Sequence, residues 1–156
     1  MILKVVLGFI LVCISSLIGV KLTDKKRFVK DLFLKLKAFN LELSADVGLY
    51  YTPLKIKLDD FNKSVDGAID GFERIFNAER YVCKDRRLNL FQREFISDYI
   101  NSLGVFDEKG QIKYQDKTDK RIESFLADSE AVFSKYSALS TKLSFCLGLT
   151  LFIIIV

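Results

Sequence analysis

The stretch FVKDLFLKLKAFNLELSADVGLY, residues 28–50, decides the fold class of this protein. Large apolar side chains return in it at steps of three or four residues: Phe28, Leu32, Leu36, Phe39, Leu43, Val47 and Tyr50. Because an α-helix turns once every 3.6 residues, this spacing places them all on one helix face. The stretch therefore predicts an amphipathic helix whose apolar face packs against other helices.

The chain after Tyr50 divides into shorter helices. Thr52 is a favoured N-cap residue and Pro53 suits the first helical position, so we expect a second helix to start there. Apolar residues predict a third helix at Ile69, Phe72, Ile75 and Phe76, and a fourth at Leu88, Phe91, Phe95, Tyr99 and Leu103, which Gly104 would end.

The last helix is expected to begin near Gln111 and to run to the end of the sequence. Its predicted core stripe is Ile122, Phe125, Ser129, Val132, Tyr136, Leu139 and Leu143. No segment alternates apolar and polar residues as a strand does. The prediction is an all-α, membrane-anchored helical bundle, and a long coiled-coil hairpin capped by the short helices is the alternative.

Both ends of the sequence are apolar. Residues 1–20 carry one charged side chain, Lys4, and twenty helical residues span about 30 Å, the thickness of the bilayer core. A cleaved signal peptide is less favoured, because no small-residue cleavage site follows the long apolar stretch. Residues 143–156, LSFCLGLTLFIIIV, reach only about 21 Å, so either a full crossing or a partial insertion stays open.

The charges beside these ends predict an orientation. Lys21, Lys25, Lys26, Arg27 and Lys30 follow the first segment, and such residues favour the cytoplasmic side. The predicted organisation is a transmembrane helix over residues 1–22, a cytoplasmic helical domain over 23–142 and a hydrophobic membrane tail over 143–156.

Composition argues against several functional classes. The chain has no histidine, and its three cysteines (Cys13, Cys83 and Cys146) lie far apart, so no nucleophile–histidine pair, metal site or disulfide framework is predicted. No phosphate-binding loop or hydrolase motif occurs. Basic residues alternate with acidic ones, which is typical of a solvated helix face rather than of a nucleic-acid site. We expect a protein that is not an enzyme and has no cofactor.

Several short elements, taken in order, resemble a known family. Leu3-Lys4 opens the first apolar segment, Tyr50-x-Thr52-Pro53-Leu54 follows the long helix, and Leu103-Gly104 precedes Asp107 and Gln111. In this order, and with apolar segments at both ends, the chain resembles the stage III sporulation protein AB family almost end to end. That family is similar to the inner-membrane platform protein of type II secretion and type IV pilus machines.

The resemblance implies a function and partners. It implies a platform or assembly subunit of the channel between mother cell and forespore, located in the mother-cell membrane around the forespore with its main domain in the cytoplasm. Its implied partners are membrane lipid, the stage III sporulation ATPase and other channel subunits, and it could form a homo-oligomer. A holin-like, membrane-perturbing protein is the alternative. The candidate partner-facing residues are Lys25, Lys26, Arg27, Tyr50, Thr52, Pro53, Leu54, Leu103, Gly104, Asp107 and Gln111.

Overall fold

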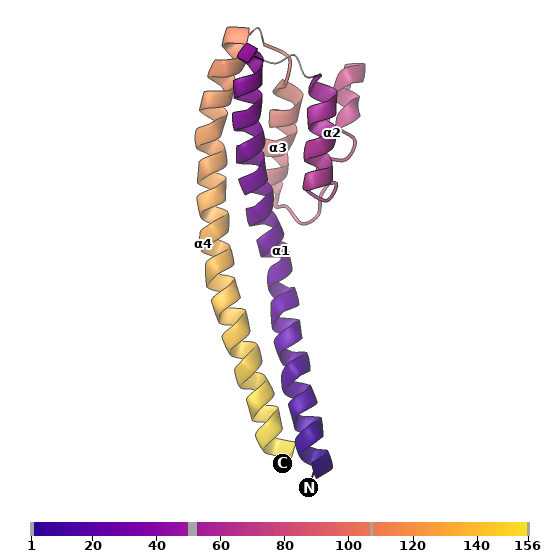
Figure 1. The fold of residues 1–156 in the computed structure, drawn as a ribbon, viewed down its shortest axis with the longest axis vertical. Coiled ribbons are helices and arrows are strands. Elements are labelled where there is room, and N and C mark those ends of the chain that lie inside the picture. The colour runs from indigo at the N-terminus through magenta and orange to yellow at the C-terminus, as the bar shows by residue number, and fades with distance from the viewer. Residues whose placement is uncertain (1, 50–52, 107, 156) are drawn as a thin grey trace. The chain divides into compact units, whose positions relative to one another are not determined.

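The computed structural model describes residues 2–49, 53–106 and 108–155 (Figure 1). The regular elements in these ranges are all helical: α1 Ile2–Leu49, α2 Leu54–Ser64, the 3-10 helix η1 Phe72–Asn77, α3 Leu90–Ser102 and α4 Glu108–Ile155. The prediction of an all-α fold is confirmed. Among the same residues, no helix combines the length and the apolar character that a bilayer crossing requires.

The chain forms two compact units, and α1 and α4 each contribute to both. Unit 1 consists of Met1–Lys30 and Asp128–Val156, and unit 2 consists of Asp31–Ala127. The helix that the apolar stripe after Phe28 predicts is confirmed up to Leu49, and it is the second part of α1, which begins at Ile2.

Aromatic rings from all four α-helices form the core of unit 2. Phe33 of α1 stacks on Phe125 of α4 with 5.1 Å between ring centroids, and Phe95 of α3 lies 4.9 Å from Phe125. Phe39 of α1 stacks on Phe61 of α2 at 4.5 Å. Much of the stripe predicted on the first helix is buried here, namely Leu32, Leu36, Phe39 and Leu43.

The prediction of a third α-helix is wrong. The segment instead contains turns and the six-residue 3-10 helix η1, which has left-handed residues at both ends, Gly71 (φ 83°) and Ala78 (φ 58°). Asp66 and Gly67 also have positive φ. Since an α-helix requires negative φ throughout, these residues break the helix that the apolar spacing predicts. Ile69 and Phe72 are nevertheless buried.

The short helices begin close to their predicted positions. Pro53 is the N-cap of α2 rather than its first helical residue, with extended backbone at ψ 127°. Asn89 caps α3 through a reciprocal capping box with Gln92. Gly104 follows α3 at φ 75°, as predicted for a C′ residue, whereas Phe91 leaves the predicted core stripe and is 72% exposed.

Unit 1 pairs the first part of α1 with the last part of α4, and the two run antiparallel side by side (Figure 1). Among the residues of this part of α4 whose burial the structure describes, those that are buried or half-buried are mostly small: Ser129, Phe133, Ser137, Ser140, Ser144 and Gly148. The predicted core residues of this part are exposed instead: Val132, Tyr136, Leu139 and Leu143. The prediction is confirmed for Ser129, which is buried, and wrong for these four large residues. Small side chains let two helices approach closely, and large ones do not.

Candidate functional site

Two of the short elements that carry the family resemblance meet in the structure. Leu54 begins α2 and Gly104 ends α3, and a Cβ atom on Gly104 would lie 3.6 Å from Leu54 Cδ2. Pro53 and Gly104 are exposed, and Leu54 is half-buried. These elements thus form a junction between the start of one helix and the end of another. We call Pro53, Leu54 and residues 103–106 the α2–α3 junction.

The junction exposes apolar side chains that the sequence reasoning did not single out. Leu103 is buried, but Val105 is 69% exposed and Phe106 is 46% exposed. The Phe106 ring contacts Tyr114 of α4, with centroids 5.3 Å apart. The two apolar residues after the glycine are visible in the sequence, but their exposure is not.

The other motif candidates are placed less favourably for contact with a partner. Gln111 is only 7% exposed, and neither of its amide atoms has a hydrogen-bond partner among the described residues. Its side chain therefore lies inside the bundle. Tyr50, Thr52 and Asp107 lie outside the described residues.

The predicted basic cluster lies in unit 1. Lys25 and Arg27 are exposed, whereas Lys26 is half-buried with its ammonium 5.2 Å from the centre of the Tyr136 ring. Lys30 lies 5.0 Å from the Phe133 ring in the same way. An ammonium over an aromatic face is held electrostatically, so Lys26 and Lys30 join α1 to α4 within this unit.

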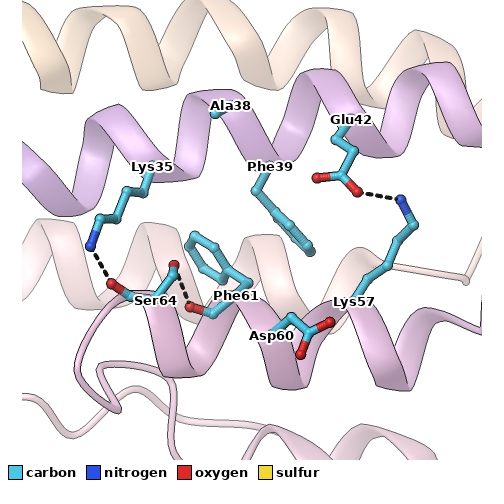
Figure 2. A pocket seen from close by; sticks show the side chains of 8 residues that line it. All are labelled: Lys35, Ala38, Phe39, Glu42, Lys57, Asp60, Phe61 and Ser64. Carbon is cyan, nitrogen blue, oxygen red and sulfur yellow. Dashed lines mark hydrogen bonds and ion pairs between the residues drawn. The ribbon is translucent and has the colours of Figure 1, made fainter.

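A small pocket of about 290 Å³ separates α1 from α2 in unit 2 (Figure 2). Its rim is charged, but the cations already bind protein oxygens: Lys35 donates to the Ser64 carbonyl, and Lys57 pairs with Glu42 at 2.8 Å. Its floor is the Phe39–Phe61 stack. The pocket therefore joins two helices and offers a ligand little uncompensated charge.

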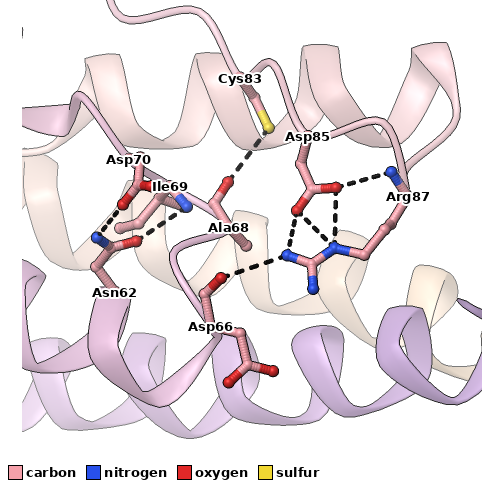
Figure 3. A network of polar contacts seen from close by, with 8 residues as sticks. All are labelled: Asn62, Asp66, Ala68, Ile69, Asp70, Cys83, Asp85 and Arg87. Atoms are coloured by element: carbon pink, nitrogen blue, oxygen red, sulfur yellow. Dashed lines mark hydrogen bonds and ion pairs between the residues drawn. The ribbon is translucent and has the colours of Figure 1, made fainter. Parts of the chain in front are cut away.

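A network of polar contacts holds the irregular chain between α2 and α3 (Figure 3). The Asn62 amide donates to Asp70 at 2.7 Å and accepts from the Ile69 amide at 3.1 Å. Arg87 binds Asp85 through two guanidinium nitrogens, with a shortest distance of 2.6 Å. The Asn62 side chain thus pairs the Ile69 backbone N–H, which a helix would have bonded internally, and the side-chain bonds to Asp70 and Asp85 hold the segment in place without a helix.

A second polar set is buried in unit 2 and was not foreseen. The Tyr99 hydroxyl donates to Asn40 Oδ1 at 3.2 Å, and Asn40 Nδ2 donates to the Gln115 carbonyl at 3.2 Å. Ser44 donates to Gln115 Oε1 at 2.9 Å. We call these four residues the polar layer. The i, i+4 spacing of Asn40 and Ser44 beside an apolar stripe was the signal in the sequence.

Two buried titratable groups of unit 2, Cys83 and Tyr99, have pKa values that burial raises. Burial raises the pKa of the Cys83 thiol, which disfavours the reactive thiolate. Burial likewise raises the pKa of Tyr99. Among residues 2–49, 53–106 and 108–155, no three cysteine or carboxylate side chains lie close enough together to hold a metal ion.

Comparison with known proteins adds no relative to this description. No protein-family model, curated protein or solved structure matches the chain.

Proposed function

We propose that this chain is a non-enzymatic platform subunit that attaches to a membrane through the apolar ends of unit 1 and binds partner proteins through unit 2 and through the exposed basic residues Lys25 and Arg27 of unit 1. The proposal includes the role that the family resemblance implies, the docking of a secretion-type ATPase at the membrane of a sporulation channel. One observation carries it, the inverted packing of α4 in unit 1.

In a water-soluble helix pair, large apolar side chains face the partner helix and small polar ones face water. Among the residues of α4 whose burial the structure describes, the arrangement is reversed, since Ser129 and Gly148 are buried and several serines are half-buried while large apolar residues are exposed. The exposed residues are Leu139, Leu143, Phe145, Leu147, Leu149 and Ile153, and Ile153 is 75% exposed. Small residues between helices and large ones outside are typical of helix pairs in lipid.

The described side chains in the first part of α1 include exposed large apolar ones. Ile10, Ile14 and Leu17 are all exposed, with Leu17 at 67%. Exposed large apolar side chains thus occur on both helices of unit 1, and clusters of such residues mark contact with a membrane or a partner. Lys21, Lys25 and Arg27 follow on α1, where basic residues would meet anionic headgroups.

The native cysteines provide a direct test of membrane attachment. Cys13 and Cys146 are exposed on unit 1, and Cys83 is buried in unit 2. The chain would be expressed with Cys83→Ser, and membrane vesicles would be treated with a water-soluble maleimide. We expect Cys13 and Cys146 to stay unlabelled in vesicles, because thiols in lipid do not ionise, and to react once urea and detergent unfold the protein.

A cysteine at the exposed position 109, Lys109→Cys, is the matched control and should react in open vesicles. Rapid labelling of Cys13 and Cys146 in intact vesicles would refute attachment through unit 1.

Partner docking is tested by co-purifying the ATPase with the full chain. Reversing Lys25 and Arg27 to glutamate should reduce recovery of the ATPase, whereas Lys113→Glu on α4 should not. Equal recovery would exclude the basic cluster as the docking region.

A further inference from the structure

The chain between η1 and α3 contains a short extended segment, Arg80–Lys84. Burial alternates along it with a period of two, since Tyr81 and Cys83 are buried while Arg80, Val82 and Lys84 are exposed. This alternation is the mark of extended chain, in which successive side chains point to opposite faces. We call residues 80–84 the extended segment.

One edge of the extended segment is bound to α3. The Tyr81 amide donates to Asn101 Oδ1 at 2.8 Å, and Asn101 Nδ2 donates to the Tyr81 carbonyl at 2.9 Å. The Cys83 amide donates to Ser97 Oγ at 2.9 Å. Tyr81 and Cys83 are two residues apart, about 6.7 Å along extended chain, and Ser97 and Asn101 are four residues apart, about 6 Å along a helix. Because the two spacings are similar, Asn101 can bind Tyr81 while Ser97 binds Cys83. The helix side chains thus take the place of a neighbouring strand.

The opposite edge has no such partner among the residues that the structure describes. Backbone groups alternate between the two edges of extended chain, so those of Arg80, Val82 and Lys84 point away from Ser97 and Asn101. Among the described residues, none makes a hydrogen bond to these backbone groups. Buried backbone groups are almost always paired, and the three residues are exposed, so this edge faces water. It is an open strand edge in an otherwise helical protein.

The side chains on the open edge select what can pair with it. Arg80 and Lys84 flank Val82, which is 54% exposed. Asp98 lies 3.7 Å from Arg80, but both side chains are largely exposed and the pair is weak. If a second copy paired through the same edge in antiparallel fashion, Arg80 would face Lys84. Like charges directly opposite are destabilising, so the pattern disfavours self-pairing and favours an acidic strand.

We propose that the extended segment is a docking strand for an extended acidic segment of a partner protein. The partner segment would add itself antiparallel to the open edge, with carboxylates opposite Arg80 and Lys84 and an apolar residue opposite Val82. Backbone hydrogen bonds would supply affinity, and the acid–x–apolar–x–acid pattern would supply specificity. This inference rests on the proposed partner-binding role and names the chemistry of the partner.

The test uses the full chain in detergent micelles and a labelled, end-capped peptide, Thr-Asp-Thr-Val-Thr-Glu-Thr, followed by fluorescence anisotropy. N-methylation of the Asp, Val and Glu nitrogens removes donors that face the protein and should weaken binding by about tenfold or more. N-methylation of the two threonine nitrogens between them is the matched control and should leave binding nearly unchanged, because those nitrogens face away.

Protein variants test the charge pattern separately. Lys84→Glu should weaken binding about tenfold, and a peptide with Lys in place of Asp should restore it, whereas Lys55→Glu on the exposed side of α2 should have no effect. Circular dichroism would establish that each variant is folded. Equal binding of the two N-methylated peptides would overturn the proposal and indicate charge attraction alone. Membrane attachment is read from Cys13 and Cys146, so its failure and the failure of this proposal are distinguishable.

Discussion

Replacing Asn40 by leucine is a sharp test of the polar layer. Asn40 is 1% exposed and accepts the only hydrogen bond that the Tyr99 hydroxyl makes among the described residues. It also donates to the Gln115 carbonyl. Leucine is similar in size to asparagine, so it fills the space while removing both hydrogen-bonding groups. The substitution therefore isolates the polar contribution from a cavity effect.

The expected loss of stability follows from the two buried groups that lose their hydrogen-bond partner, the Tyr99 hydroxyl and the Gln115 carbonyl. A buried hydroxyl without a partner costs about 1–3 kcal/mol, and the second lost hydrogen bond adds about 1 kcal/mol. Asn40→Leu should therefore lower the free energy of unfolding by about 2–4 kcal/mol. For a chain of this size, that corresponds to roughly 5–15 °C in Tm. Thermal and urea unfolding followed by far-UV circular dichroism in detergent micelles would measure it.

The control removes the Tyr99 hydroxyl, which Asn40→Leu leaves without its hydrogen-bond acceptor. Adding Tyr99→Phe to Asn40→Leu should recover about 1 kcal/mol or more, whereas Tyr99→Phe alone should destabilise the parent protein, because Asn40 then loses a donor. If the double variant is no more stable than Asn40→Leu, or if Asn40→Leu unfolds like the parent protein, the polar layer does not stabilise unit 2 as argued.

Three further predictions concern unit 2. Gly104→Ala should lower the free energy of unfolding by about 1 kcal/mol through backbone strain at φ 75°, because the added Cβ makes only an ordinary contact. Urea unfolding would measure the loss, with Gly104→Asn as the milder comparison. Equal stability of Gly104→Ala and the parent protein would contradict the prediction. Asn89→Ala should cost about 1 kcal/mol and Asn89→Ser much less, and hydrogen exchange at the start of α3 should accelerate only in the alanine variant. Burial raises the pKa of Tyr99, so above about pH 10 the tyrosine loses its proton in the unfolded chain before it does in the folded one. The free energy of unfolding should therefore fall by up to about 1.4 kcal/mol per pH unit. Urea unfolding of Tyr99→Phe should lack this part of the loss, and an unchanged pH dependence would count against the prediction.

The parts of the fold that the sequence predicts are those where local and long-range preferences agree. Leu32, Leu36 and Leu43 return with helical spacing and are buried as expected. Gly104 ends α3 because only glycine adopts positive φ there without strain. Phe91 shows the limit of the spacing, because a short α3 has too little neighbouring surface to cover it.

Other features depend on tertiary contacts that periodicity does not encode. The helix predicted around Phe72 fails because Gly67 and Gly71 adopt positive φ in turns that Asn62 stabilises from another element. On α4, helical spacing identifies both the Val132 face and the Ser137 face, but which one packs depends on how closely α1 approaches.

The same limit applies to the candidate site. The sequence predicts that Gly104 ends a helix. It does not predict that Leu54 lies against Gly104, or that residues 80–84 are extended and bound to α3.

The two helical segments of unit 1 are separated in sequence by the whole of unit 2, and this order has a consequence for how the protein is assembled. The start of α1 emerges from the ribosome long before the end of α4, so it has no intramolecular partner while residues 31–127 are being made. Folding of unit 2 closes that long loop and lowers the entropy cost of pairing the two segments. Unit 1 would therefore form last, and substitutions that slow folding of unit 2 would extend the period during which α1 is exposed to chaperones, to proteases or to the wrong helix.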